Sequence, residues 1–468
     1  MASQIRLTAE WVAAAMAGTI VAGGGRVEFS GVSIDSRTVR AGELYVGIRG
    51  EKFDGADFAA AAAKAGAAGV VVPNGRGRAV GVEGGVVIEV ADTTVALQAL
   101  ANATRKASGT KVVAITGSAG KTTTKEITAE FLGTTYRVIR NRGNLNNHIG
   151  LPLSLMELTA KPDVAVVELG MNHAGEISTL VRIAEPDVRV WTNVGEAHLG
   201  FFASVEAIAD AKAEILEGAN SESVLVANGD DPLVASRARR FAGRVMTFGL
   251  NRISDVRAEN VVERGIDGTS ARVTTPKGSF DLTTPLIGRG NLANILAATA
   301  VGVHFDVPLS AMAECAGTLK AAHHRGDVLR LGKGVVVIDD SYNANPTATR
   351  RAIEVLLSSK TSGRRVAVIG EMLELGDHGE QLHTQVGEAA ANAGVDKLVA
   401  IGGHNAVAAA VAAIMAGLPR DRAHYFKSSD EAANAFASFV QPGDLVLVKG
   451  SRGIRTDLVV DRLKAEFA

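Results

Sequence analysis

Short apolar runs alternate with longer amphipathic stretches through most of the chain. In the middle part, apolar runs at 112–115, 164–169 and 188–194 are separated by polar and Gly-rich segments, and helical spacing of apolar residues follows at 204–216. A strand that is buried on both faces of a parallel sheet is a continuous apolar run rather than an alternating one. Strands that alternate with helices therefore predict βαβ units and a mostly parallel sheet.

The pattern changes twice along the chain, and each change marks a predicted domain boundary. The N-terminal block combines short strands with an Ala-rich helix at 58–67, whereas the middle block ends in a polar, β-like part at 251–285 and a helix at 291–303. A third block has four apolar runs of its own, which predict a second, smaller doubly wound sheet. At ~150 residues per domain, the length of 468 residues also predicts about three domains. The predicted domains are residues 1–105, 106–320 and 321–468.

The composition favours a soluble α/β enzyme. Hydrophobic residues make up 47% of the chain and aromatic residues 4%, so the cores must consist mainly of Ala, Val, Leu and Ile. The 49 Lys and Arg against 50 Asp and Glu leave a net charge of −1, which argues against nucleic-acid binding because such proteins carry a basic excess. Cys315 is the single cysteine, which excludes an intrachain disulfide and fits a reducing cytoplasm. The longest Ala-rich stretch, 406–418, is shorter than the ~18 apolar residues of a membrane span and is predicted to be a buried helix.

A second apolar stretch, at 11–22, imitates a signal peptide. An acidic residue adjoins it directly, however, and only one basic residue precedes it. We expect instead a helix that Thr8 caps and that buries Trp11, Ala14 and Ala15.

The strongest local motif is a Gly-rich turn between an apolar strand and a helix. The strand at 112–115 leads into Gly117 and Gly120, and Lys121 and Thr122 open the helix. Backbone N–H groups of such a turn surround a phosphate at the helix N-terminus, while the lysine reaches the terminal phosphates and the Thr hydroxyl binds Mg²⁺. The spacing G-x-x-G-K-T is shorter than that of the full motif G-x-x-x-x-G-K-[ST], and a chance Gly-rich turn is the alternative. The residues expected to bind the phosphates of ATP are Gly117, Ser118, Ala119, Gly120, Lys121, Thr122 and Thr123.

Candidate metal ligands follow the next apolar runs. Glu168 ends a buried strand at the edge where parallel sheets place their sites, and its carboxylate could hold Mg²⁺ beside the Thr hydroxyl. His198 follows the next strand, where a structural or solvated histidine is as good an explanation as a ligand. For Lys212, on the predicted helix at 204–216, spacing alone favours a solvated lysine paired with Glu214 or Asp210.

Several segments together resemble the Mur ligase family, the ATP-dependent amide-forming enzymes of peptidoglycan precursor synthesis. The resemblance covers nearly the whole chain and is closest to the branch that adds D-alanyl-D-alanine. It is carried by segments 33–37, 42–46, 53–55, 144–152, 168–173 and 339–346, whereas 453–457 departs from the family pattern. The implied fold is α/β with three domains: a smaller α/β N-terminal domain, a central P-loop-type domain with a mostly parallel sheet, and a Rossmann-like C-terminal domain.

The resemblance also implies roles for individual residues. Lys121, His198 and Lys212 are the expected catalytic residues, and the lysine matching Lys212 is commonly carbamylated by CO₂ in the family, which turns it into an anionic ligand for a second Mg²⁺. The implied metal ligands are Thr122, Glu168, His198 and Lys212. The implied ATP contacts beyond the turn are Asn294, Arg325, Asp340 and Asn345. The implied substrate contacts are Ser36, Arg37, Asn144, Asn146, Asn147, Tyr342 and Asn343. A surface ion pair for Arg37 and a turn cap for Asn146 are the alternatives to these substrate roles.

The implied reaction activates a carboxylate with ATP. The γ-phosphate passes to the C-terminal carboxylate of UDP-N-acetylmuramoyl-tripeptide, and the amine of D-alanyl-D-alanine then displaces phosphate. We expect these two substrates as partners, no nucleic acid and no membrane, and a cytoplasmic monomer. The alternatives are a sister ligase that adds the third amino acid or extends folate with glutamate, a P-loop switch or motor, and a non-catalytic nucleotide-binding module. Segments 144–150 and 342–346 argue against the sister ligases, and the chain has no Asn-Lys-x-Asp guanine motif.

Overall fold

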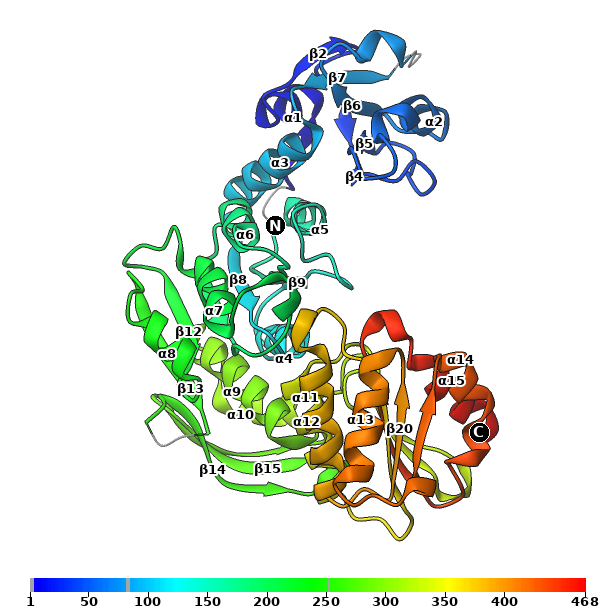
Figure 1. Cartoon of the computed structure of the whole chain (residues 1–468). Coiled ribbons are helices and arrows are strands. Elements are labelled where there is room, and N and C mark those ends of the chain that lie inside the picture. Colours follow the sequence, from blue (N-terminus) through cyan, green and yellow to red (C-terminus); the bar gives the residue numbers. More distant parts are fainter. Residues whose placement is uncertain (1–3, 81–84, 251–252) are drawn as a thin grey trace. The chain divides into compact units, whose positions relative to one another are not determined.

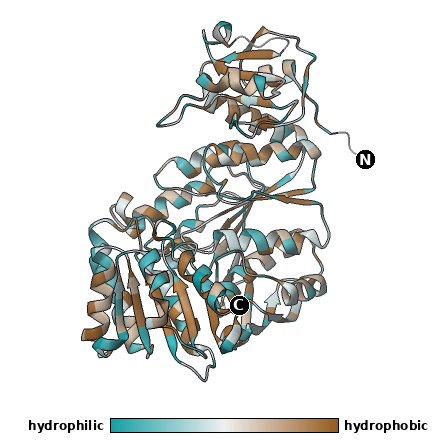
Figure 2. Ribbon diagram, turned by 90° about the vertical axis from the view of Figure 1, so that its right-hand side faces the viewer, coloured by the Kyte–Doolittle hydropathy of each residue, from teal (hydrophilic) through white to brown (hydrophobic). Residues whose placement is uncertain are grey.

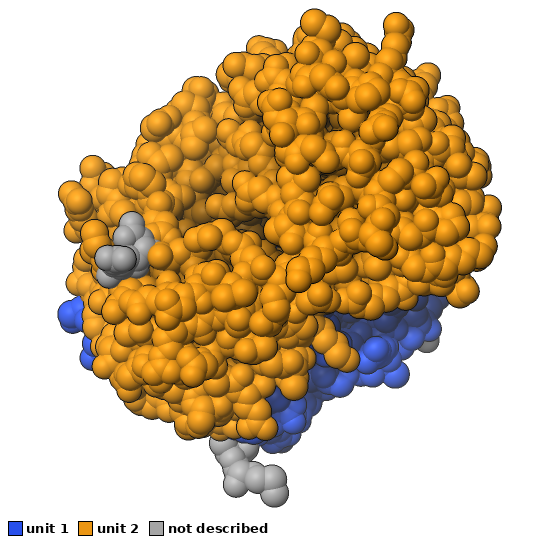
Figure 3. All heavy atoms as spheres, turned by 90° about the horizontal axis from the view of Figure 1, so that it is seen from below, with its two compact units in different colours: residues 1–114, 136–189, 214–223 blue, residues 115–135, 190–213, 224–468 orange. Residues whose placement is uncertain are grey.

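The apolar runs of the sequence form the inner strands of α/β layers in the computed structural model (Figure 1), where hydrophobic residues are concentrated (Figure 2). The structure describes residues 4–80, 85–250 and 253–468. The sheets are mostly parallel, as predicted. The chain divides into two compact units, coloured in Figure 3: residues 1–114, 136–189 and 214–223, and residues 115–135, 190–213 and 224–468.

The first unit contains a five-stranded sheet near the N-terminus. Four of its strands are parallel, and β2 pairs antiparallel with β7 at one edge. In order across the sheet, the strands are β2 (Thr19–Ala22), β7 (Val86–Val90), β6 (Gly69–Pro73), β5 (Leu44–Val46) and β4 (Val32–Ser33). A two-stranded ladder joins β1 (Leu7–Thr8) to β3 (Glu28–Phe29). The helices of this part are α1 (Ala9–Ala15), α2 (Ala59–Lys64) and α3 (Thr93–Ser108).

Helix α1 confirms the predicted cap and part of the predicted buried face, because Trp11 and Ala15 pack partly buried against the core. The Trp11 N–H donates to Thr8 Oγ1 at 3.3 Å. Val12 and Ala13 are buried, whereas Ala14 is exposed, so the expectation that Ala14 faces inward is wrong. A helix of seven residues contains too few turns for its spacing to fix which face is buried, and here packing against the sheet and α3 decides it.

The remainder of the first unit holds β9 (Val138–Arg140) and β10 (Val164–Glu168), which are parallel neighbours, and the helices α5 (Gly150–Leu155) and α6 (Glu176–Ala184). Strand β10 is buried along its whole length and ends at Glu168. The sequence pattern predicted this strand and its terminal carboxylate.

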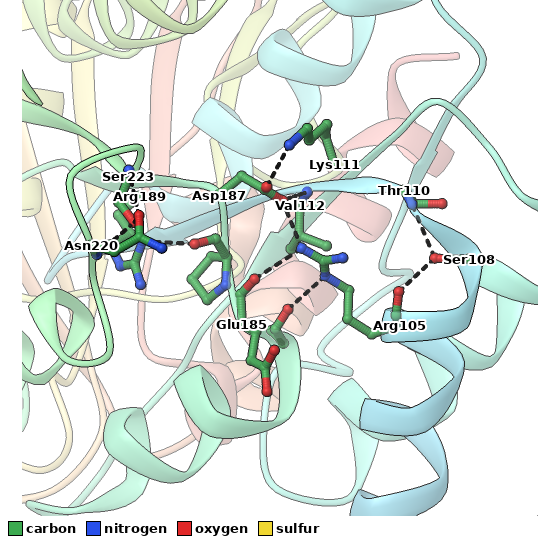
Figure 4. A network of polar contacts seen from close by, with 12 residues as sticks. Arg105, Ser108, Thr110, Lys111, Val112, Glu185, Asp187, Arg189, Asn220 and Ser223 are labelled. Atoms are coloured by element: carbon green, nitrogen blue, oxygen red, sulfur yellow. Dashed lines mark hydrogen bonds and ion pairs between the residues drawn. The ribbon is translucent and has the colours of Figure 1, made fainter. Parts of the chain in front are cut away.

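A polar network fastens the end of α3 to the segment that follows α6 (Figure 4). The Arg105 guanidinium donates from Nε to the Ala184 carbonyl at 3.1 Å and from Nη2 to Asp187 Oδ2 at 2.7 Å. Lys111 Nζ donates to Asp187 Oδ1 and the Val112 N–H to Asp187 Oδ2, both at 2.9 Å. One carboxylate therefore anchors both the end of α3 and the start of β8 (Lys111–Thr116), the strand that leads to the Gly-rich turn.

The second unit contains the end of β8, the end of β11 (Val188–Trp191) and five consecutive strands of a nine-stranded sheet. These are β12 (Val224–Asn228), β13 (Arg244–Gly249), β14 (Val256–Glu263), β15 (Thr269–Thr275) and β16 (Gly278–Thr284). The last three form an antiparallel meander, which confirms the β-like character predicted for 251–285, apart from residues 251–252, which lie outside the described residues. The helices of this part are α4 (Lys121–Gly133), α7 (Val205–Ala213), α8 (Pro232–Ala238), α9 (Gly288–His304) and α10 (Leu309–Thr318).

The C-terminal part of the second unit is the predicted second doubly wound sheet. Five strands are parallel, and β17 pairs antiparallel with β18 at one edge. The order is β17 (Asp327–Arg330), β18 (Val336–Asp340), β22 (Leu445–Lys449), β19 (Arg365–Gly370), β20 (Lys397–Ile401) and β21 (Ala423–Phe426). Its helices are α11 (Pro346–Ser358), α12 (Gly379–Asn392), α13 (His404–Met415), α14 (Ser429–Asn434) and α15 (Asp457–Glu466).

Helix α13 confirms only in part the expectation of a buried helix at 406–418. Ala409 and Ala413 are buried, but Val411 is 52% and Met415 83% exposed. An Ala-rich sequence gives little contrast between faces, so the spacing could not show which side faces solvent. No helix within the described residues has the length and apolar character to cross a membrane.

Candidate active site

The Gly-rich turn joins β8 to α4 and depends on glycine at two positions. Gly117 and Gly120 have φ angles of +152° and +80°, in the left-handed region that side chains disfavour. A Cβ at Gly117 would collide with Thr192 Oγ1, and one at Gly120 would collide with Asn294 Oδ1. The turn therefore brings the backbone into close contact with both neighbours immediately before the N-terminus of α4, where a helix attracts anions.

The segment after β11 holds the turn in this shape. The Ser118 N–H donates to the Asn193 carbonyl at 3.0 Å, and the Ala119 N–H donates to Asn193 Oδ1 at 2.9 Å. Lys121 Nζ donates to the Gly117 carbonyl at 2.9 Å, so the lysine folds back over the turn. Two of the N–H groups expected at the phosphate are thus directed at Asn193, a residue that the sequence analysis did not identify.

Asn294, predicted to contact the nucleotide, lies beside the turn although 170 positions separate it from Thr124. It is 8% exposed on α9, and its Oδ1 accepts from Thr124 Oγ1 at 3.2 Å. Packing of α9 against α4 explains the proximity. The structure therefore brings Asn294 and the Gly-rich turn together.

Lys212 is a buried amine, not the solvated lysine that spacing alone favoured. Its side chain is 1% exposed on α7. The two expected ion-pair partners are engaged elsewhere: Asp210 with Arg237 at 2.8 Å, and Glu214 with the Gly175 N–H at 2.6 Å. Burial, and secondly the charge of Lys121, lowers the pKa of Lys212 well below its ordinary value. Burial therefore favours the uncharged form of this amine more than it does for a solvated lysine.

His198 lies in the loop after β11, with φ +66°. Its Nδ1 is 2.6 Å from Glu374 Oε2, which belongs to the loop after β19. This hydrogen bond lowers the pKa of Glu374, so the carboxylate is ionised. The neighbouring Glu196 forms an ion pair with Arg350 at 3.2 Å and accepts from Thr347 Oγ1 at 2.8 Å. The His198 loop is thereby attached to the C-terminal sheet at two places.

Glu168 is 4% exposed at the end of β10 and is held by asparagine side chains. Asn146 Nδ2 donates to Glu168 Oε1 at 2.8 Å, and the Glu168 N–H donates to Asn141 Oδ1 at 3.0 Å. Asn147 Oδ1 accepts from the Gly150 N–H at 2.8 Å at the start of α5. The side chain of Asn146 is thus bonded to the predicted metal ligand instead of capping a turn.

The Asn144 carbonyl accepts from the Asn146 N–H at 2.8 Å, and Asn144 is otherwise exposed. Among the described residues, no three His, Cys, Asp or Glu side chains lie close enough to hold a metal ion.

Three of the predicted C-terminal residues, Tyr342, Asn343 and Asn345, lie in the loop after β18, Asp340 ends β18, and Arg325 precedes β17. Lys449, at the end of β22, bridges this loop: its Nζ donates to Asp340 Oδ2 at 2.6 Å and to the Asn343 carbonyl at 3.0 Å. The Arg325 guanidinium carbon lies 4.0 Å from the Tyr342 ring centroid, a cation–π contact. These contacts bring Arg325, Asp340 and Tyr342 close to the loop after β18, and the roles of these residues toward ligands stay predictions.

Two asparagines of the same loop serve local structure. Asn345 Oδ1 accepts from the Ala348 N–H at 2.8 Å and caps α11. Asn343 Oδ1 accepts from the Ala344 N–H at 2.9 Å.

Ser36 and Arg37 follow β4 in the N-terminal sheet. Arg37 pairs with Asp35 at 2.7 Å and is largely exposed, which is the ion-pair alternative considered for it. Hydrogen bonds from Arg37 lower the pKa of Asp35 to about 2. Ser36 is half-buried. The substrate role of both residues stays a prediction.

Family models match three consecutive parts of the chain. The Mur ligase family catalytic domain matches residues 28–105, the Mur ligase middle domain residues 115–302, and the Mur ligase glutamate ligase domain residues 324–452. The chain belongs to the Mur ligase family. This confirms the resemblance inferred from the motifs.

Individual members of the family are similar over almost the full chain. The UDP-N-acetylmuramoyl-tripeptide–D-alanyl-D-alanine ligase of Bacillus subtilis is 35% identical over 437 residues, which cover 92% of this chain and 93% of the relative. Crystal structure I of MurF from Acinetobacter baumannii has a TM-score of 0.89 at 30% identity and 99% coverage of both chains. The MurF ligase from Thermotoga maritima in complex with ADP has a TM-score of 0.80 at 30% identity, covering 93% of this chain and 97% of that one. The predicted α/β fold of three domains is confirmed by these matches.

Proposed function

We propose that this chain joins D-alanyl-D-alanine to the C-terminal carboxylate of UDP-N-acetylmuramoyl-tripeptide, using ATP and releasing ADP and phosphate. The chain is an ATP-dependent amide-forming ligase of peptidoglycan precursor synthesis. The observation that carries this function is the full-length similarity to ligases of that name and to an ADP-bound MurF, together with a Gly-rich turn that opens α4 with Lys121. A P-loop switch and a sister ligase are the alternatives that the assay below separates.

The reaction requires activation of a carboxylate, because a carboxylate is a poor electrophile and has no leaving group. Transfer of the γ-phosphate forms an acyl phosphate; the amine then attacks its carbonyl carbon, and the tetrahedral intermediate expels phosphate. Most of the catalysis is positioning and charge neutralisation. Lys121 would leave the Gly117 carbonyl for the β- and γ-phosphates, and the N-terminus of α4 would add positive potential.

Two Mg²⁺ ions are a further part of the proposal, one held by Thr122 and Glu168 and the second by His198 and a carbamylated Lys212. The donor chemistry fits: a hydroxyl, a buried carboxylate and an imidazole are present, and the buried Lys212 amine has the lowered pKa that attack on CO₂ requires. The new N–C bond forms as one proton leaves, and the amine becomes an anionic oxygen ligand. When bound, Mg²⁺ would neutralise charge between the phosphates and the acceptor carboxylate.

The finer assignments complete the proposal. The three domains are residues 1–105, 106–320 and 321–468, supported by family models that fall within these limits. The chain acts as a cytoplasmic monomer, in the compartment that supplies ATP. The nucleotide contacts Asn294, Arg325, Asp340 and Asn345. The UDP-linked and peptide substrates contact Ser36, Arg37, Asn144, Asn146, Asn147, Tyr342 and Asn343.

Phosphate release from ATP tests the function. We expect release only when UDP-N-acetylmuramoyl-tripeptide and D-alanyl-D-alanine are both present, with the pentapeptide product detected by mass. Release without either substrate would favour the switch, and activity with a single amino acid in place of the dipeptide would favour a sister ligase. Incubation with ¹³C-bicarbonate tests the modification: a carbamate signal should appear in the wild type and be absent from Lys212→Met.

A further inference from the structure

The carboxylate of Glu374 fixes which ring nitrogen of His198 carries a proton. The two residues are 176 positions apart, and Glu374 Oε2 lies 2.6 Å from His198 Nδ1. An ionised carboxylate only accepts hydrogen bonds, so Nδ1 must be the donor. In the neutral imidazole the other nitrogen, Nε2, is then the one without a proton and is able to bind a metal ion.

We propose that Glu374 is a positioning residue that holds His198 in the Nδ1–H tautomer and so prepares its Nε2 for Mg²⁺. The metal role of this inference rests on the proposed function. Histidines that bind metals almost always donate their second ring N–H to a carboxylate or carbonyl, which fixes the ring and raises its basicity. The pair of His198 and Glu374 has this arrangement, with Nδ1 2.6 Å from the carboxylate.

The loop that carries Glu374 is built to keep the carboxylate in place. The Met372 N–H donates to His383 Nε2 at 2.8 Å, and the next N–H, of Leu373, donates to Ser451 Oγ at 2.9 Å. His383 is itself 1% exposed. Two consecutive residues before Glu374 are therefore fixed by separate elements of the C-terminal sheet domain.

The two loops also meet through their backbones. The Gly200 N–H donates to the Glu374 carbonyl at 2.8 Å, so Glu374 is bound to the His198 loop by main chain as well as by side chain. Both His198 and Glu374 have left-handed backbones, with φ +66° and +65°. Non-glycine residues adopt this conformation at a cost and persist in it where surrounding contacts impose it, often at functional sites. Here both strained residues present their side chains to each other.

The pairing spans two domains of the second unit. His198 belongs to the part matched by the middle-domain model, and Glu374 to the part matched by the glutamate ligase domain model. The C-terminal domain thus supplies the group that orients a metal ligand of the central domain. The orientation of His198 as a metal ligand therefore depends on where the C-terminal domain lies.

The tautomer can be measured directly in metal-free protein. Long-range ¹H–¹⁵N spectra of histidine-labelled enzyme report which ring nitrogen is protonated, and His198→Ala identifies the signal. We expect the Nδ1–H form in the wild type, its loss in Glu374→Ala, and its retention in Glu374→Gln, whose amide oxygen still accepts. Glu371→Gln is the matched control, because Glu371 lies in the same loop but bonds to the Gly403 N–H instead.

Binding of Mn²⁺, followed by electron paramagnetic resonance, gives a second readout. We expect Glu374→Ala to weaken Mn²⁺ binding about 10- to 100-fold, Glu374→Gln to weaken it less, and Glu371→Gln to leave it unchanged. Wild-type tautomer populations in Glu374→Ala, or Mn²⁺ affinity within twofold of the wild type, would overturn the inference. If His198 is not a metal ligand, His198→Ala will bind Mn²⁺ as tightly as the wild type does. In that case the tautomer measurement alone decides whether Glu374 positions His198.

Discussion

The contact between Gly120 and Asn294 gives the sharpest test of the nucleotide site. Gly120→Ala places a Cβ against Asn294 Oδ1 and forces a side chain into φ +80°. The left-handed backbone alone costs an alanine about 1–2 kcal/mol. In addition, Asn294 must move, which breaks its hydrogen bond with Thr124, worth about 1 kcal/mol, and withdraws its side chain from the proposed nucleotide contact.

We therefore expect Gly120→Ala to lower ATP affinity at least tenfold, or about 1.4 kcal/mol, measured by calorimetry. The matched control is Gly109→Ala. Gly109 also has positive φ, +68°, but nothing lies within 4 Å of the position of its Cβ. This control has the same backbone cost without a collision, so it should lower the melting temperature and leave ATP affinity unchanged.

A double-mutant cycle isolates the collision. If displacement of Asn294 causes the loss, Asn294→Ala alone should weaken ATP binding, and adding Gly120→Ala should weaken it further by much less than in the wild-type background. Fully additive losses would show that the turn acts without Asn294. ATP affinity within twofold of the wild type in Gly120→Ala would refute the reasoning about the turn altogether.

Three further predictions concern lysine and tyrosine side chains. Lys121→Ala should abolish turnover while circular dichroism shows an intact fold, and turnover within tenfold of the wild type would contradict its phosphate role. Lys212→Met should melt at a higher temperature than the wild type at pH 7 in CO₂-free buffer. Because the pKa of Lys212 is lowered in the folded chain, the unfolded chain binds more protons, and the wild type gains stability as the pH rises. The difference in melting temperature between the two proteins should therefore shrink toward pH 10.5. A difference independent of pH in calorimetry would count against a neutral buried amine. Tyr45 donates to the Gly55 carbonyl at 2.8 Å, and burial raises its pKa to about 12, so its contribution is present below pH 10 and is lost between pH 10 and 12. Tyr45→Phe should destabilise the N-terminal sheet by about 1 kcal/mol and remove this alkaline loss in urea titrations.

The parts of the fold that the sequence predicted correctly are those determined by neighbouring residues. The strands β8, β10, β19 and β20 are continuous apolar runs, and the phosphate turn is a contiguous motif between a strand and a helix. Helix faces were harder to predict, because α1 is short and α13 is almost uniformly apolar. In both helices, contacts with neighbouring elements determine which side is buried.

The residues that sequence reasoning missed are those whose function depends on a distant partner. Asn193 accepts a hydrogen bond from the Gly-rich turn, and Glu374 is hydrogen-bonded to His198, which lies 176 positions away in the sequence. An isolated Asn or Glu in a loop belongs to no sequence motif that would predict its partner. Lys121, in contrast, follows Gly120 in a contiguous motif that predicts its role. Lys212 shows the same limit, because its helix spacing suggested a solvated amine and only the folded chain shows that the side chain is buried and its pKa lowered.

The contacts of the second unit indicate why a ligase of this kind would divide its site between two sheets. Each substrate charge must be neutralised, and water must be kept from the acyl phosphate, which it would otherwise hydrolyse. Here the phosphate turn and His198 belong to one sheet, while Glu374 and Arg325 belong to the segment that the other sheet carries. Because the group that orients a metal ligand comes from the second sheet, catalysis would depend on where that sheet is placed, and a closed placement would keep water from the intermediate.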